Sequence, residues 1–167
     1  MVILLMGVSG AGKTTVGQLL ASEQGWEFVD GDDYHSPENV EKMRNGIPLT
    51  DADRAPWLEA LRVRIASWVE ERKNAVLACS ALKQAYRMHL QVGPEVRVVY
   101  LQGSAQLLRE RLRVRRGHFM TEQMLDSQLA ALEPPENATV VEVDQSPAVI
   151  TAEIRKRLAL PERPDRG

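Results

Sequence analysis

Short apolar runs alternate with longer amphipathic stretches along the chain. A continuous run of branched apolar residues predicts a strand that is buried on both faces. Apolar stretches of strand length occupy residues 2–6, 26–30, 75–79, 96–101 and 139–144. Because helical patterns separate these stretches, we expect a three-layer α/β/α fold, in which helices cover both faces of a mainly parallel five-stranded sheet.

Residues with capping preferences mark where the helices between these strands begin and end. Ser36-Pro37 places an N-cap residue before a proline at the first helical position, and Gly25 is predicted to end the first helix. Thr50-x-x-Asp53 resembles a capping box. It opens a helix whose apolar stripe consists of Trp57, Leu61, Ile65 and Trp68.

A chain of 167 residues is about one domain long. We expect a single domain over residues 1–160, followed by a proline-rich, charged and disordered tail over residues 161–167. Two helical insertions, about residues 36–62 and 116–132, need not belong to the sheet. The first is a candidate for acceptor binding and the second for a mobile lid.

Composition narrows the classes of protein. The net charge of -2 and the pI of about 6.0 lack the basic excess of a nucleic-acid binder. No run of about 18 apolar residues predicts a membrane span. The single cysteine, Cys79, excludes an intrachain disulfide and is expected to be a small buried hydrophobic residue rather than a nucleophile. We therefore expect a soluble cytoplasmic protein that binds neither nucleic acid nor membrane.

A phosphate-binding motif, Gly7-x-x-x-x-Gly12-Lys13-Thr14, lies between the first strand and the first helix. Its glycines let successive N–H groups surround an anion, and the following helix directs its positive end at the phosphates. We expect Lys13 to reach the β- and γ-phosphates and to act in catalysis, and the Thr14 hydroxyl to bind Mg²⁺. The predicted ATP contacts are Gly7, Val8, Ser9, Gly10, Ala11, Gly12, Lys13, Thr14 and Thr15.

Such a loop, the P-loop, also occurs in GTPases and transporter ATPases. A GTPase needs an Asp-x-x-Gly switch and an Asn-Lys-x-Asp base reader, and the chain has neither string. An apolar strand that ends in Asp-Glu and a Ser-Gly-Gly signature, which a transporter ATPase needs, are also missing. These absences favour a small kinase. A module that senses ATP without transferring phosphate stays open as an alternative.

The second strand ends in Asp30-Gly31-Asp32-Asp33. The carboxyl ends of parallel strands border the ligand crevice, and alternate strand residues share a face, so Asp30 and Asp32 could both face the phosphates. One carboxylate would orient the acceptor hydroxyl and take its proton, and the other would hold the water shell of Mg²⁺. A solvated acidic turn is the alternative, and Asp33 fits a turn or cap residue.

Basic residues that follow the third strand could bind an anion. If a helix starts near Ala81, Lys83 and Arg87 face the same way and could hold an anionic acceptor or the transferred phosphoryl group. Solvated helix charges are the alternative. His35 and His118 are lone histidines that could bond a substrate hydroxyl, although such residues are more often surface or capping residues.

Five arginines, Arg109, Arg111, Arg113, Arg115 and Arg116, precede Gly117. In small kinases a mobile lid that carries arginines closes over ATP and excludes water. Arg109, Arg113 and Arg116 share one helical face, whereas Arg111 and Arg115 share another, and only one face can reach ATP. A nucleic-acid-binding helix is the rival interpretation, which the net charge disfavours.

Several longer strings resemble the thermoresistant-type gluconokinases, and the similarity runs from about residue 3 to residue 157. The strings are Leu5-Met6-Gly7-Val8-Ser9-Gly10-Ala11-Gly12-Lys13-Thr14, Val29-Asp30-Gly31-Asp32, His35, Glu41-Lys42-Met43, Gly46-Ile47-Pro48-Leu49, Asp53-Arg54-x-Pro56-Trp57-Leu58, Cys79-Ser80-Ala81-Leu82-Lys83-x-x-Tyr86-Arg87, Arg115-x-Gly117-His118-Phe119 and Val143-Asp144-Gln145. Two of them, Cys-Ser-Ala-Leu-Lys and Asp-Arg-x-Pro-Trp-Leu, are far more particular to this family than the P-loop is.

The resemblance implies the shikimate-kinase-like variant of the nucleoside-monophosphate-kinase fold. It also implies transfer of phosphate from Mg·ATP to the 6-hydroxyl of D-gluconate, and a homodimer. The implied roles are Asp32 as base, Asp30 as a second-shell Mg²⁺ partner, His35, Arg54, Lys83 and Arg87 as the acceptor clamp, Arg111 and Arg115 as the adenine-stacking and catalytic lid arginines, and Gln145 in the loop at the adenine edge. Spacing alone does not separate gluconate from shikimate, adenylyl sulfate or a nucleoside monophosphate.

Overall fold

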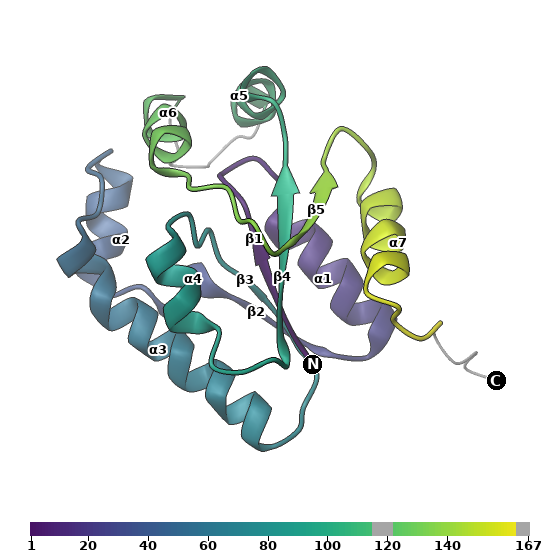
Figure 1. Ribbon diagram of the computed structural model, residues 1–167. Helices are drawn as coiled ribbons and strands as arrows, with labels where there is room; N and C mark the ends of the chain where they lie inside the picture. The colour runs from purple at the N-terminus through teal and green to yellow at the C-terminus, as the bar shows by residue number, and fades with distance from the viewer. Residues whose placement is uncertain (115–121, 163–167) are drawn as a thin grey trace.

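Five parallel strands form one sheet in the order β2-β3-β1-β4-β5 (Figure 1). This computed structural model describes residues 1–114 and 122–162. The strands are β1 (Val2–Met6), β2 (Glu27–Asp30), β3 (Ala75–Ala78), β4 (Val96–Gln102) and β5 (Thr139–Glu142). The predicted α/β fold and its five strands are therefore confirmed.

Helices cover both faces of the sheet, as Figure 1 shows. The helices are α1 (Lys13–Gln24), α2 (Pro37–Arg44), α3 (Asp51–Glu70), α4 (Gln84–Leu90), α5 (Ala105–Val114), α6 (Glu122–Ala131) and α7 (Pro147–Arg157). A short 3₁₀ turn, η1 (Gly31–Tyr34), follows β2. Helices α1 and α7 lie against one face of the sheet, and α3 and α4 lie against the other.

The centre of the sheet has no solvent-facing side, which explains its continuous apolar sequence. All five residues of β1 are buried. Alternate β1 side chains enter the two cores: Ile3 and Leu5 pack with α1 and α7, whereas Leu4 packs with α3 and α4. Because side chains of a strand alternate between its faces, an apolar residue at every position fits a strand that is covered on both sides.

The helix boundaries predicted at Ser36, Thr50 and Gly25 are confirmed. Ser36 Oγ accepts a hydrogen bond from the N–H of Asn39, and Thr50 forms a reciprocal capping box with Asp53. Gly25 takes the left-handed conformation that ends α1. The apolar stripe of α3, which consists of Trp57, Leu61, Ile65 and Trp68, is buried.

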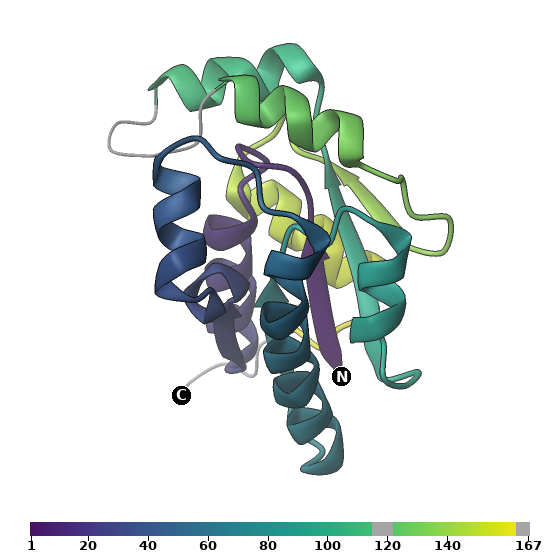
Figure 2. The ribbon, with the colours of Figure 1, turned by 90° about the vertical axis from the view of Figure 1, so that its left-hand side faces the viewer.

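Helices α5 and α6 lie side by side over the edge at which the parallel strands end (Figures 1 and 2). Residues 36–62 correspond to α2 and the first part of α3. Of the other predicted insertion, residues 122–131 form α6, whereas residues 116–121 lie outside the described parts of the chain, as do residues 163–167 of the predicted tail. Across residues 1–114 and 122–162, no helix has the length and apolar character that crossing a membrane requires.

Candidate active site

The phosphate loop connects β1 to the start of α1. Gly12 adopts φ 90° as the N-cap residue of α1, a backbone conformation that residues with a Cβ rarely adopt. The N–H groups of the first turn of α1 have no acceptor within the helix, so this helix start can bind an anion. Lys13 extends back along the loop, and its ammonium group donates to Val8 O across 3.2 Å.

Asp30 joins the phosphate loop to the turn after β2. Its Oδ2 accepts the Thr14 hydroxyl proton across 2.8 Å, and its Oδ1 accepts the N–H of Asp32 across 3.0 Å. Gly31 permits this turn because a Cβ at that position would lie 2.8 Å from Ala78 O. The prediction that Asp30 and Asp32 share a strand face is wrong, since β2 ends at Asp30 and Asp32 belongs to η1, yet both residues line one cavity.

Asp32 lines this cavity, and its side chain is exposed to solvent. The protein walls still displace much of its hydration, and this desolvation raises the pKa of Asp32. The nearby charge of Lys13 lowers the pKa of Asp32, whereas Asp30 and Asp33 raise it. A carboxylate with a raised pKa that lies near a phosphate loop is suited to accept a proton.

The cavity has a volume of about 830 Å³, which is in the upper part of the range of about 300–1,000 Å³ for small-molecule sites. It brings together residues that are far apart in the sequence. The predicted site residues that line it are Ser9, Gly10, Ala11, Gly12, Lys13, Thr14, Thr15, Asp30, Asp32, His35, Arg54, Arg111 and Gln145. Gly7 and Val8 are buried behind the loop, and neither they nor Lys83 and Arg87 line the cavity.

His35 packs flat on Trp57, with ring centroids 4.2 Å apart and an interplanar angle of 14°. Desolvation and then the charge of Arg54 lower the pKa of His35 to about 4, so the ring is neutral at neutral pH. Trp57 is itself fixed, because its indole N–H donates to Gly31 O across 2.7 Å. The stacking and this hydrogen bond connect His35, a predicted acceptor-binding residue, to the turn that carries Asp32.

A cluster of hydrogen-bonded polar side chains lies between α3 and α4. Asp51 accepts hydrogen bonds from Tyr86 and from Lys83, the latter across 3.0 Å. Arg54 donates to the Tyr86 hydroxyl across 3.2 Å. The hydrogen bonds from Tyr86 and Lys83 lower the pKa of Asp51, and that of Lys83 is raised. Thus Lys83 and the cavity residue Arg54 belong to one connected network, although Lys83 is outside the cavity wall.

Arg87 does not pair with Lys83 on one helical face. The predicted helix start near Ala81 is wrong: α4 begins at Gln84, after a turn in which Ala81 has a φ of 45°. Arg87 is buried, and its guanidinium donates to the carbonyls of Ala81, Leu82 and Glu133 across 2.8, 3.0 and 2.7 Å. Its donors hold the backbone together, which corrects its placement in an acceptor clamp.

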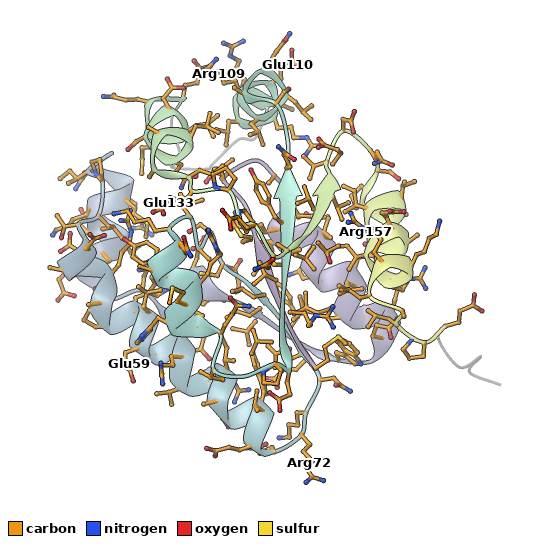
Figure 3. All side chains as sticks on the ribbon, viewed as in Figure 1. Glu59, Arg72, Arg109, Glu110, Glu133 and Arg157 are labelled. Carbon is orange, nitrogen blue, oxygen red and sulfur yellow. The ribbon has the colours of Figure 1, made fainter. Side chains whose placement is uncertain are left out.

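The arginines of α5 separate by face, as the helical spacing predicts. Arg111 turns toward the site and donates to the carbonyls of Gly10 and Val143. Arg109 pairs with Asp126 at 2.6 Å, and Arg113 pairs with Glu122, so both bind α6 instead. Figure 3 shows Arg109 on the outer side of the helical pair. Arg115, Arg116 and His118 lie outside the described residues.

Helix α6 contributes cavity residues that sequence reasoning missed, namely Met124, Ser127 and Gln128. Gln128 Oε1 accepts the backbone N–H of Ser9 across 2.8 Å. No local pattern marks a polar helix residue whose partner is 119 positions away. Cys79 is buried as expected, and desolvation raises the pKa of its thiol to about 12, so it is not a nucleophile.

A P-loop that faces a carboxylate, on a sheet of this topology, defines a P-loop kinase of small acceptors. Residues 2–135 match the family described as AAA domain. Shikimate kinase from Aquifex aeolicus has the same fold, with a TM-score of 0.60 and 17% identity over 95% of this chain and 96% of that one. This likeness confirms the predicted shikimate-kinase-like fold.

Relatives at higher identity define the family. A probable gluconokinase from Mus musculus is 46% identical over 94% of this chain and 97% of its own length. A gluconokinase structure from Sinorhizobium meliloti has a TM-score of 0.81 and 43% identity, and the match covers 94% of each chain. The chain belongs to the gluconokinase family.

Proposed function

We propose that this protein is a gluconokinase, which transfers the γ-phosphoryl group of ATP to the 6-hydroxyl of D-gluconate and releases 6-phosphogluconate and ADP. The observation that carries the proposal is the continuity of one cavity from the P-loop to Asp32, His35 and Arg54. Gluconate has a primary alcohol and a carboxylate, so it matches a site that presents a proton acceptor and a cation. Membership of the gluconokinase family supports this substrate.

Asp32 orients the 6-hydroxyl and accepts its proton as the oxygen attacks the γ-phosphorus. Its raised pKa suits this role, and Lys13 is close enough to influence that pKa. Lys13 also neutralises charge on the β- and γ-phosphoryl oxygens. Because there is little covalent chemistry for the protein to perform in phosphoryl transfer, positioning and charge stabilisation dominate the rate enhancement.

Thr14 and Asp30 fit a magnesium site. The Thr14 hydroxyl is a hard oxygen ligand, and its proton is already directed to Asp30, which leaves an oxygen lone pair for the metal. Asp30 would then orient the Thr14 ligand through this hydrogen bond without contacting the metal, as outer-shell carboxylates do at metal centres. A magnesium ion held there would supply positive charge that neutralises the phosphate oxygens of ATP.

We assign the acceptor end of the cavity to His35 and Arg54, with Lys83 acting through its network with Asp51 and Tyr86. The neutral ring of His35 can donate to a gluconate hydroxyl, and Arg54 can bind the gluconate carboxylate. His118 and Arg115 stay predictions, as a substrate ligand and a catalytic lid arginine. Arg87 is left out of the clamp, because its donors are used by backbone carbonyls.

The adenine end is assigned to Arg111 and Gln145, which line the same cavity. Arg111 is held by the carbonyls of Gly10 and Val143, so its guanidinium plane has a fixed orientation on which a base can stack. Helices α5 and α6 are proposed to form the lid. The family resemblance also supports a cytoplasmic homodimer, and light scattering on the purified protein would test the oligomeric state.

An assay of ADP release that is coupled to a second enzyme tests the proposed function. ADP release should require gluconate and Mg·ATP together. Release at the same rate without gluconate, or no release at all with gluconate, would exclude gluconate phosphorylation. In the second case tight ATP binding would identify a nucleotide-sensing module instead.

A further inference from the structure

The side chain of Gln128 connects helix α6 to the phosphate loop. Its Oε1 accepts the N–H of Ser9 across 2.8 Å. A backbone N–H can only donate, so this contact fixes which end of the amide faces the loop. The NH₂ group of Gln128 is thereby left to face another partner. Gln128 and Asp32 line the same cavity, so the partner can be a ligand.

The position of Gln128 is fixed by contacts along α6. Just beyond the end of the helix, the N–H of Glu133 donates to Leu82 O across 2.8 Å, and Arg87 donates to Glu133 O. Figure 3 places Glu133 between α6 and α4. Asp126 is paired with Arg109 of α5. A side chain on a helix that is held at several points can position a ligand more accurately than one on an unsupported loop.

The contact between Gln128 and Ser9 leaves room for a ligand. With this hydrogen bond formed, the cavity still has a volume of about 830 Å³, which is in the upper part of the range of about 300–1,000 Å³ for small-molecule sites. The first-turn N–H groups of Thr14 and Thr15 have no acceptor within α1, so they can donate to a bound phosphate. Nucleotide binding therefore does not require Gln128 to leave Ser9.

We propose that Gln128 recognises the γ-phosphoryl group of ATP: it stays bound to the N–H of Ser9 and donates its NH₂ group to a γ-phosphoryl oxygen. This inference rests on the proposed kinase function. A neutral amide suits the role, since it offers a donor without adding a negative charge near the triphosphate, and a hydrogen bond to a charged oxygen is strong. Gln128 thus distinguishes a bound triphosphate from a diphosphate and connects α6 to the reacting group.

Calorimetric titration with Mg·ADP and with the β,γ-imido analogue of Mg·ATP tests the proposal without an acceptor. Gln128→Met should weaken the binding of the imido analogue roughly tenfold, as expected for one lost charge-assisted hydrogen bond, and that of ADP by less than about twofold. Gln128→Glu retains an acceptor for Ser9 but adds a charge, so it should weaken the analogue further. Gln123→Met, at an exposed position of the same helix, is the matched control and should change neither affinity.

Equal weakening of both nucleotides would overturn the proposal and indicate a structural role. Tighter binding by Gln128→Met would also overturn it, because Gln128 would then compete with phosphate for the N–H of Ser9. If Gln128→Met does not fold, the affinities of Gln128→Glu for Mg·ADP and for the imido analogue test the proposal instead. These titrations do not involve gluconate, so an absence of gluconate turnover would contradict the proposed function separately.

Discussion

The Thr14 hydroxyl donates to Asp30 Oδ2 across 2.8 Å, and this bond connects the phosphate loop to the turn that carries Asp32. The proposed metal ligand and the proposed base therefore share one supporting carboxylate. A disturbance at Asp30 reaches both, because the other oxygen of the same carboxylate accepts the N–H of Asp32.

Asp30→Asn should raise the Mg²⁺ concentration needed for half-maximal activity. An amide can accept the Thr14 proton but lacks the negative charge that supports the metal ligand, and the loss of an outer-shell partner typically costs about 10–100-fold in metal affinity or activity. A Mg²⁺ titration of ADP release measures the change. Asp144→Asn, on an exposed residue beyond β5, is the control, and an unchanged Mg²⁺ requirement in Asp30→Asn would contradict the assignment.

Asp32→Asn should lower kcat by roughly a hundredfold or more, which is the effect of losing a general base. Asp33→Asn removes the neighbouring exposed carboxylate of the same turn and should retain most of the activity. Steady-state kinetics with saturating gluconate and ATP compare the two variants. A kcat for Asp32→Asn within a few-fold of the unmodified enzyme would mean that Asp32 only positions the acceptor.

Lowering the pH below 6.5 should destabilise the protein through His35. The pKa of His35 is about 4 in the folded state and 6.5 when unperturbed. Between these values the unfolded chain binds a proton that the folded chain does not. The free energy of unfolding is therefore unaffected by His35 above pH 6.5 and decreases as the pH falls toward 4. The full slope of about 1.4 kcal/mol per pH unit is reduced because water reaches part of the ring.

Urea denaturation at pH 7, 6 and 5 measures this effect when the protein is compared with His35→Gln. The difference in unfolding free energy between the two proteins should shrink or change sign as the pH falls. A difference that is constant over this range would show that His35 titrates normally in the folded state.

Arg87→Met should lower the unfolding free energy by about 2–4 kcal/mol, because it removes the donors from three carbonyls in a buried setting. Arg62→Met, which removes one exposed contact to His89 O, should cost less than about 1 kcal/mol. Chemical denaturation checks both values. Unchanged stability in Arg87→Met, together with a raised KM for gluconate, would restore Arg87 to the acceptor clamp.

Local features made much of the fold predictable from the sequence. The strand before Gly7, the N-cap at Ser36 and the capping box at Thr50 each depend on residues that are close together in the sequence. Short-range sterics and hydrogen bonds therefore determine their structure. The five strands and the three layers followed from these signals and are confirmed.

The details of the site depend on tertiary contacts that no local sequence pattern indicates. Lys83 and Arg87 do not share a helical face as predicted, because Ala81 adopts a left-handed conformation and α4 begins only at Gln84. Strand alternation failed at Asp32 because the Asp30 carboxylate caps a 3₁₀ turn. The contact between Gln128 and Ser9 joins positions 119 residues apart, and only the packing of α6 over the sheet creates it.

The most direct test of the proposed function is the rate of ADP release measured with gluconate, shikimate and nucleoside monophosphates as separate acceptors, at fixed Mg·ATP. Turnover with gluconate in the usual range for kinases, about 1–100 s⁻¹, and formation of one 6-phosphogluconate per ADP are the predicted result. Lys13→Ala should abolish most of this turnover. Preferential turnover of shikimate or a nucleoside monophosphate, with none of gluconate, would contradict the proposed function.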